Sequence, residues 1–139
     1  MQKILAPDIN DSHVLALVAS LKTGSSTTYV DHVPLPDKPC NECFPTVEEH
    51  VQSYGGESVF GWAIQQFPGI WLEAEFHAVW QSPQGQLVDI SPREILLDKL
   101  LFLPDLNRKY QGIQVENVFY PLVNEPNVLK HIQLAHDFF

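Results

Sequence analysis

The chain has 139 residues, of which 45% are hydrophobic and 11% aromatic, a composition typical of a globular domain. Its formal net charge is −9, and its eight Lys and Arg residues offer little charge to a phosphate backbone, so we expect no nucleic-acid partner. No apolar run approaches the ~20 residues of a membrane span, and the first residues lack the apolar core and cleavage site of a signal peptide. We therefore expect a cytoplasmic protein that does not enter a membrane and whose two cysteines stay reduced.

The spacing of apolar residues predicts one domain over residues 1–139, with two helices first, then several strands, then a last helix. Asp11 or Ser12 is expected to cap the first helix. This order is typical of an α+β fold in which helices pack on one face of an antiparallel sheet. The expected bounds are a helix at about 10–22, a Pro-rich loop at 25–41, a helix at 43–54, a sheet within 58–122 and a helix at about 127–137.

Residues 71–92 predict a β-hairpin that brings a histidine and an aspartate to one face. Apolar and polar residues alternate through the first strand, so His77 is expected on the face of the strand that does not carry the apolar side chains. The turn at 82–85 suits a three-residue loop that ends in a left-handed glycine. In that register Val79 pairs with Asp89, and the Cα atoms of His77 and Asp89 are diagonal neighbours about 7–8 Å apart. A two-residue loop would move Asp89 to the other face.

A histidine held by a carboxylate can activate a nucleophile, and a candidate thiol lies upstream in the segment CNECFPTVEEHVQSYGG at 40–56. Pro45 fits the first turn of a helix, and Gly55-Gly56 end it. Cys43 is therefore expected at the start of the helix. Backbone N–H groups and the helix dipole at that position favour a thiolate over a thiol.

The order of these pieces resembles the transglutaminase-like branch of the papain-like superfamily. In that pattern a nucleophilic cysteine opens a helix, one strand follows, a second carries HAW or a similar string, and a third ends in an aspartate near a proline. The matching pieces are Cys43 with its helix, VFGWAI at 59–64, FHAVW at 76–80 and LVDISP at 87–92. A group of small bacterial proteins of unassigned function carries a similar string around GWAI, EAEFHAVW and VDISP. The resemblance implies a papain-like core with Cys43 as nucleophile, His77 as base and Asp89 as the orienting carboxylate.

Three other residues are candidates for the walls of a substrate groove beside these groups. Trp71 shares the His77 face at the start of its strand and offers flat apolar area. Glu75 lies on the same face, where its charge favours a protonated His77, although Glu73 and Glu75 also fit a solvated strand face. Asn41 and the backbone N–H of Cys43 are the candidates for stabilising an oxyanion.

The cysteine pair leaves two other chemistries open. Cys40 and Cys43 form a Cys-x-x-Cys before a helix, which is also typical of a redox pair, although residues 30–39 lack the apolar strand that precedes such a pair. Zinc held by Cys40, Cys43 and His77 is the other alternative, with His50 or His32 as possible further ligands. The sequence has no second Cys-x-x-Cys and no His-x3-His to complete four ligands. Each residue also has a structural interpretation, as a buried thiol, a half-exposed histidine or a strand-end aspartate.

Together these features predict a cysteine-dependent acyl-transfer enzyme, either an amide hydrolase or a transglutaminase-like enzyme. Its substrate would be a peptide, a protein or a small amide, and the chemistry needs no cofactor. The alternative class is a non-catalytic binding module, a zinc-stabilised module or a catalytically silent relative of the superfamily.

Overall fold

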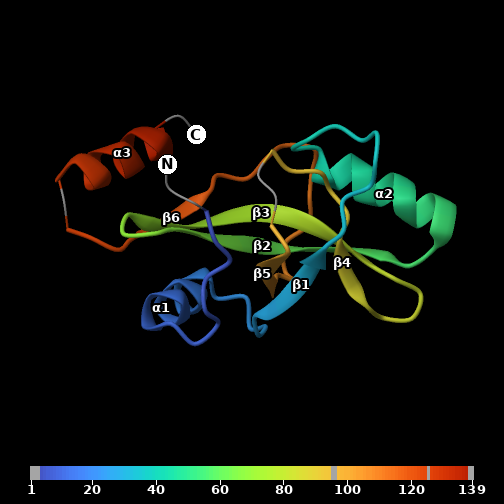
Figure 1. The fold of residues 1–139 in the computed structure, drawn as a ribbon, viewed down its shortest axis with the longest axis horizontal. Coiled ribbons are helices and arrows are strands. Elements are labelled where there is room, and N and C mark those ends of the chain that lie inside the picture. The colour runs from blue at the N-terminus through green and yellow to red at the C-terminus, as the bar shows by residue number, and fades with distance from the viewer. Residues whose placement is uncertain (1–3, 95–96, 125, 138–139) are drawn as a thin grey trace.

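The computed structural model describes residues 4–94, 97–124 and 126–137, and a long two-stranded hairpin crosses its centre (Figure 1). The hairpin consists of β2, Glu57–Phe67, and β3, Trp71–Gln81. The two strands pair without interruption from Glu57 opposite Gln81 to Phe67 opposite Trp71. The central part of one face of the hairpin is apolar, with Phe60, Trp62 and Ile64 of β2 opposite Ala78, Phe76 and Ala74 of β3.

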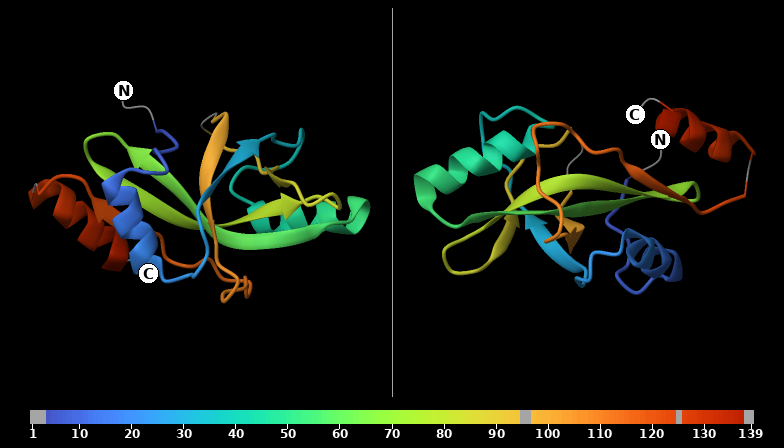
Figure 2. Two further views of the ribbon diagram at one scale, coloured as in Figure 1. Left: turned by 90° about the horizontal axis from the view of Figure 1, so that it is seen from below. Right: turned by 180° about the vertical axis from the view of Figure 1, so that it is seen from behind.

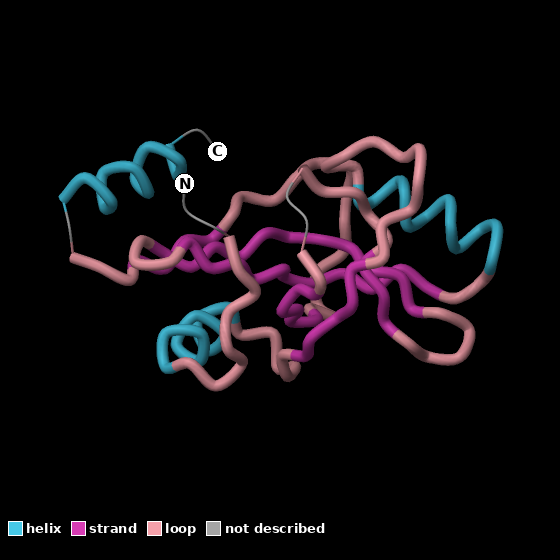
Figure 3. The backbone as a smooth tube through the Cα atoms, viewed as in Figure 1, coloured by secondary structure: helices cyan, strands magenta, loops and turns pink. Residues whose placement is uncertain are grey.

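The sheet curves into a closed five-stranded barrel, in the order β2-β5-β1-β4-β3 with β3 returning to β2. A sixth strand, β6, extends the sheet from the outer edge of β3. Figure 3 shows these strands as one curved layer flanked by helices. The remaining strands are β1 at Thr28–His32, β4 at Leu87–Asp89, β5 at Lys99–Pro104 and β6 at Val118–Pro121.

The predicted α+β class is confirmed, but the prediction of an antiparallel sheet is wrong at one pair of strands. β1 lies parallel to β4, with Asp31 opposite Val88 and His32 opposite Asp89. The sequence predicts a Pro-rich loop at 25–41 where β1 forms, because five residues flanked by Gly, Ser and Pro give a weak periodic signal. This short strand joins β4 to β5 and so closes the barrel.

Apolar side chains on the two faces of the strands form two separate clusters. The smaller cluster fills the barrel, as is usual for barrels with few strands, and consists of Val30, Ala63, Val79, Leu100 and Phe102 with Val59 and Leu87 packed against it. The larger cluster joins the other face of the strands to the helices α1, Ser12–Leu21, and α2, Cys43–Tyr54. These two helices lie at opposite ends of the hairpin (Figure 1).

The third helix, α3 at Pro126–Asp137, lies against β6. His131 of α3 stacks on Trp71, which points to the side of β3 opposite Leu72 and Ala74. Figure 2 shows α3 beyond the barrel, next to β6. The prediction that the helices pack on one face therefore holds for α1 and α2, whereas α3 lies at the end of the hairpin, with His131 on Trp71 and Ile132 in a cavity shared with Leu21 and Trp62.

The helix bounds agree with the predicted ones to within two residues, and the caps explain where they begin and end. Asp11 accepts hydrogen bonds from the backbone N–H groups of His13 and Val14, so α1 begins at Ser12 as expected. No side chain caps the first turn of α2. In the described part of the chain, none of the helices combines the length and apolar character that a membrane span requires.

The outer edge of β3 is shared by two short strands with a gap between them. β6 pairs with residues 71–74 and β4 with residues 80–81, so no strand of the described chain covers residues 75–79 on that side. Instead, the side-chain amide of Gln114 donates a hydrogen bond of 3.1 Å to the carbonyl of Phe76. This gap is where the candidate site forms.

Gly61 is the residue that lets β5 approach β2 closely enough to close the barrel. It lies opposite both His77 and Pro104, and a Cβ atom there would collide with the carbonyl of Leu103 and the ring of Phe102. We expect Gly61→Ala to lower the free energy of unfolding by about 3 kcal/mol, measured by urea denaturation.

Gly69→Ala is the matched control for this substitution. Gly69 is left-handed with φ 75°, and a Cβ atom added there would meet no other atom within 4 Å. Only backbone strain of about 1–2 kcal/mol opposes alanine at that turn. If Gly61→Ala lowers the free energy of unfolding no more than Gly69→Ala does, the close approach of β5 to β2 is not what requires glycine at position 61.

Candidate active site

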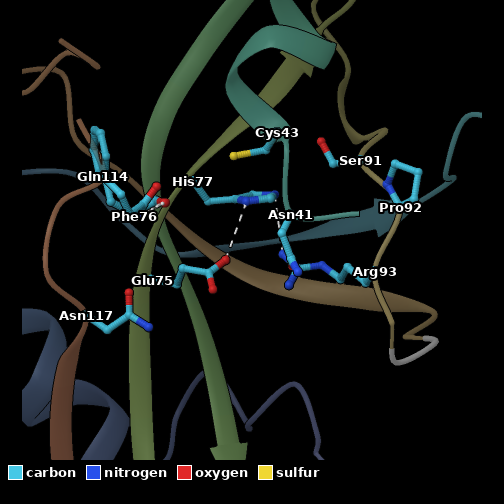
Figure 4. Close-up of a pocket in the computed structure, with 10 residues that line it drawn as sticks. All are labelled: Asn41, Cys43, Glu75, Phe76, His77, Ser91, Pro92, Arg93, Gln114 and Asn117. Atoms are coloured by element: carbon cyan, nitrogen blue, oxygen red, sulfur yellow. Dashed lines mark hydrogen bonds and ion pairs between the residues drawn. The ribbon is translucent and has the colours of Figure 1, made fainter. Parts of the chain in front are cut away.

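A pocket of about 340 Å³ opens at the gap in the edge of β3 (Figure 4). β3 contributes Glu75, Phe76 and His77 to its lining, and the start of α2 contributes Cys43. The segment after β4 and the segment before β6 complete the walls with Ser91, Pro92, Arg93, Gln114 and Asn117, while Asn41 lies beside the start of α2. Segments that are far apart in the sequence thus meet in one cavity.

Cys43 is the first residue of α2, and its thiol points toward the imidazole of His77 (Figure 4). The residue is 8% exposed and packs in the larger cluster with Phe44 and Val47. Asn41, in a left-handed conformation with φ 61°, turns the chain into the helix. Pro45 has no N–H group, and no side chain caps the first turn of α2. The backbone N–H groups of Cys43 and Phe44 therefore remain available to stabilise negative charge at this end.

His77 and Asp89 form a buried hydrogen-bonded pair. The Nε2 atom of His77 lies 2.9 Å from Oδ1 of Asp89, and neither residue is more than 3% exposed. The predicted register brings them together: Trp80 pairs with Val88, and the N–H of Ser82 donates to the carbonyl of Gln86 across a turn. The three-residue loop predicted from the sequence is therefore confirmed, and with it the shared face of the histidine and the aspartate.

Three other groups surround the Asp89 carboxylate. Arg93 donates from Nε to Oδ2 at 3.3 Å, and the backbone N–H of Ser91 lies 3.4 Å from Oδ1. The Nε2 atom of His32 approaches Oδ2 to 3.9 Å. A carboxylate with no exposure to water needs such partners, because an unpaired charge in the interior is very costly.

Burial and charge act in opposite directions on this pair. Burial lowers the pKa of His77, but the charge and hydrogen bond of Asp89, together with the interaction with Cys43, outweigh it and raise the pKa from 6.5 to about 9. Burial raises the pKa of Asp89, whereas the charge and hydrogen bond of His77, followed by the charges of Arg93 and His32, lower it below its usual 3.8. At neutral pH the pair is therefore an imidazolium and a carboxylate.

The second ring nitrogen of His77 faces the pocket. Nδ1 is buried and has no well-formed hydrogen bond, although the Cys43 thiol is close enough to raise the pKa of the ring. An oxygen of Glu75 lies 3.8 Å from Nδ1, on the pocket side of the ring. The proton on Nδ1 is thus the one that a molecule in the pocket would meet.

The structure brings together most of the residues predicted for the site. Cys43, His77 and Asp89 meet, and Asn41 and Glu75 line the same pocket as expected. Trp71 lies outside this pocket. It shares a face with His77, but the two are six positions apart along the strand, about 20 Å, and Trp71 packs against Phe119 and His131.

The metal alternative finds no support in the geometry. Within residues 4–94, 97–124 and 126–137, no group of three His, Cys, Asp or Glu side chains is arranged to hold a metal ion, and Cys40, Cys43 and His77 form no such group. Cys40 is exposed, Cys43 is buried, and both thiols are free.

Several residues of the site were not predicted from the sequence, among them Ser91, Arg93, Gln114 and Asn117, and His32 was considered only as a possible zinc ligand. Arg93 follows Asp89 by four residues, and a basic residue at that distance was the one local signal available. His32 and Gln114 reach the site through strand pairing and loop packing, which leave no local pattern.

No family model, curated protein or solved structure matches this chain. The chemistry of the pocket must therefore be argued from its own residues.

The raised pKa of His77 predicts how stability changes with pH. Because the folded state holds the proton more tightly than the unfolded state, the stabilisation is complete below pH 6.5 and is lost as the pH rises through about 9. We expect the midpoint of thermal unfolding, followed by circular dichroism, to fall across this range in the wild type.

His77→Gln isolates the contribution of this histidine, because glutamine does not titrate. The variant should show a smaller fall in the midpoint over the same pH range. An equal fall in both proteins would assign the pH dependence to other groups. Asp89 acts at the opposite end: its stabilisation is present above its ordinary pKa of 3.8 and is lost on acidification.

Proposed function

We propose that this protein is a cysteine-dependent acyl-transfer enzyme, with hydrolysis of an amide as the overall reaction and transfer to an amine as its variant. One observation supports the proposal above the others. A thiol at the start of a helix and an imidazolium line one pocket, and a buried carboxylate binds the imidazolium on the ring nitrogen away from the thiol. Nucleophilic catalysis by cysteine uses groups of these three kinds.

The charge state of His77 determines the order of proton transfers. Its ring is already protonated at neutral pH, so the histidine stabilises a Cys43 thiolate as an ion pair. The thiolate sulfur attacks the carbonyl carbon of the amide and forms a tetrahedral intermediate. Nδ1–H of His77 then gives its proton to the departing amine nitrogen, the C–N bond breaks, and a thioester on Cys43 remains.

Deacylation reverses these roles. The now neutral His77 takes a proton from water, the hydroxide oxygen bonds to the thioester carbon, and the C–S bond breaks to release a carboxylic acid and restore the thiolate–imidazolium pair. An amine that replaces the water gives a new amide instead. Asp89 remains ionised throughout and keeps Nε2 of the ring occupied, so that Nδ1 carries the proton in both steps.

The negative charge on the intermediate needs donors beside the sulfur. Since no side chain caps α2, the backbone N–H of Cys43 is free for this purpose, and Asn41 lines the same part of the pocket. The hydroxyl of Ser91 also lines the pocket and is buried without a hydrogen-bond partner, so it offers a third donor.

Differential alkylation tests the thiolate directly, with Cys40 as the control in the same molecule. At about pH 6, where an ordinary thiol is almost fully protonated, iodoacetamide should modify Cys43 at least tenfold faster than the exposed Cys40. Proteolysis after Glu42 places the two cysteines in different peptides, and mass spectrometry measures both rates.

The same experiment on His77→Ala shows whether the imidazolium is the cause. We expect the rate at Cys43 to fall to that of Cys40 or below, while the rate at Cys40 is unchanged. A Cys43 that reacts no faster than Cys40 in the wild type, or equally fast in both proteins, would exclude the thiolate–imidazolium pair.

Asp89→Asn tests the carboxylate, and Asp105→Asn is the matched control. Asp105 is also buried, but it binds the indole N–H of Trp62 at 3.1 Å and lies outside the pocket. With 4-nitrophenyl acetate as the acyl donor, Asp89→Asn should slow the burst of nitrophenolate about a hundredfold, because His77 loses the charge that holds its proton. Asp105→Asn should leave the burst rate almost unchanged, and equal effects of the two variants would point to a structural role for Asp89.

A further inference from the structure

His32 is a buried polar residue that has no role in the mechanism proposed above. It ends β1, its side chain is 1% exposed, and both of its ring nitrogens face backbone carbonyl oxygens. Nδ1 lies 3.0 Å from the carbonyl of Leu97, and Nε2 lies 2.8 Å from the carbonyl of Ser91. These are the distances of two good hydrogen bonds.

The chemistry of imidazole limits how both contacts can be made. A neutral ring has one N–H, so one of its nitrogens would face a carbonyl oxygen with lone pair against lone pair. Only a ring with two protons donates to both oxygens. The Asp89 carboxylate, 3.9 Å from Nε2, is the negative charge beside this ring, and Arg93 and His77 contact the same carboxylate from the loop and from β3.

We propose that His32 is a positioning residue of the candidate active site, held as an imidazolium that fixes both Asp89 and the loop forming one wall of the pocket. This inference rests on the proposed function and adds a fourth residue to it. Ser91 follows β4 and Leu97 precedes β5, and the ring of His32 contacts the backbone carbonyl of each. The pocket-lining residues Ser91, Pro92 and Arg93 belong to that segment.

The arrangement gives Asp89 a cationic partner on each side. His77 binds Oδ1, whereas Arg93 and His32 lie beside Oδ2. Removal of His32 would leave the carboxylate ionised but free to rotate toward Arg93, and the ring of His77 would lose its fixed orientation. The effect would therefore reach Cys43, although His32 touches neither the thiol nor the pocket.

The protonation of His32 can be measured in the wild-type protein. With ¹⁵N-labelled histidine, a long-range ¹H–¹⁵N spectrum near neutral pH should show both ring nitrogens of His32 protonated, with the assignment made from His32→Gln. A spectrum with one unprotonated nitrogen in that ring would overturn the inference. This measurement needs no variant to be active, and it stands whatever the outcome at Cys43.

His32→Gln tests the positioning role, and His13→Gln is its matched control. Glutamine can replace one hydrogen bond but carries no charge, whereas His13 lies half exposed on α1 beside Asp11 and outside the pocket. We expect His32→Gln to slow alkylation of Cys43 by iodoacetamide about tenfold and to shift the titration of the His77 ring to lower pH, with no change at Cys40.

The outcomes separate the two proposals. If His77→Ala slows alkylation of Cys43 but His32→Gln, still folded by circular dichroism, leaves that rate and the His77 titration unchanged, the positioning role is wrong and the proposed function stands. If His77→Ala does not change the rate of Cys43 alkylation, the proposed function fails. The ¹H–¹⁵N spectrum then still shows whether both ring nitrogens of His32 are protonated.

Discussion

The hydrogen bond between His77 and Asp89 is the interaction on which the candidate site depends. Both side chains are almost entirely buried, so each ion is stabilised mainly by the other and by the groups around them. Buried ion pairs seldom improve stability over apolar side chains of similar volume. A small protein that keeps one beside a thiol, in a pocket open to small molecules, has the properties of a functional site more than those of a structural element.

The barrel holds this pair in place with backbone pairing on several sides. β3 is fixed to β2 along its entire length, and β4 is held between β3 and β1. A histidine and an aspartate on such strands have little freedom to separate. The Cys43 thiol belongs to α2, which lies outside the barrel and packs its first residues into the larger apolar cluster. The thiol lies beside the part of β3 whose outer edge is not paired with another strand of the described chain. Rigid elements therefore set the relative positions of all three groups.

Local patterns predicted the parts of the fold that depend on neighbouring residues. The alternation in β3, the loop length before Gln86 and the start of α2 at Cys43 were all readable, since each depends on a few consecutive residues. The parallel pairing of β1 with β4 was not, because it joins distant segments and β1 is too short to show a clear period. The same limit explains why the contact of His32 with Asp89 was not predicted, since it depends on this pairing. For Trp71 the reason is different: residues on one strand face point the same way but can lie far apart.

The contacts around Asp89 explain why β1 and the segment after β4 matter to the proposed reaction. If His77 alone held the carboxylate, each transfer of its proton to a substrate would leave a buried anion without a cation. In the proposed mechanism, Arg93 and His32 would remain beside Asp89 when His77 becomes neutral, which favours an ionised carboxylate that can bind the imidazolium again. The closure of the barrel by β1 and the course of the segment after β4 supply these two groups. Local periodicity predicted the contact of His77 with Asp89 but not β1. This strand nevertheless brings His32 to the same carboxylate.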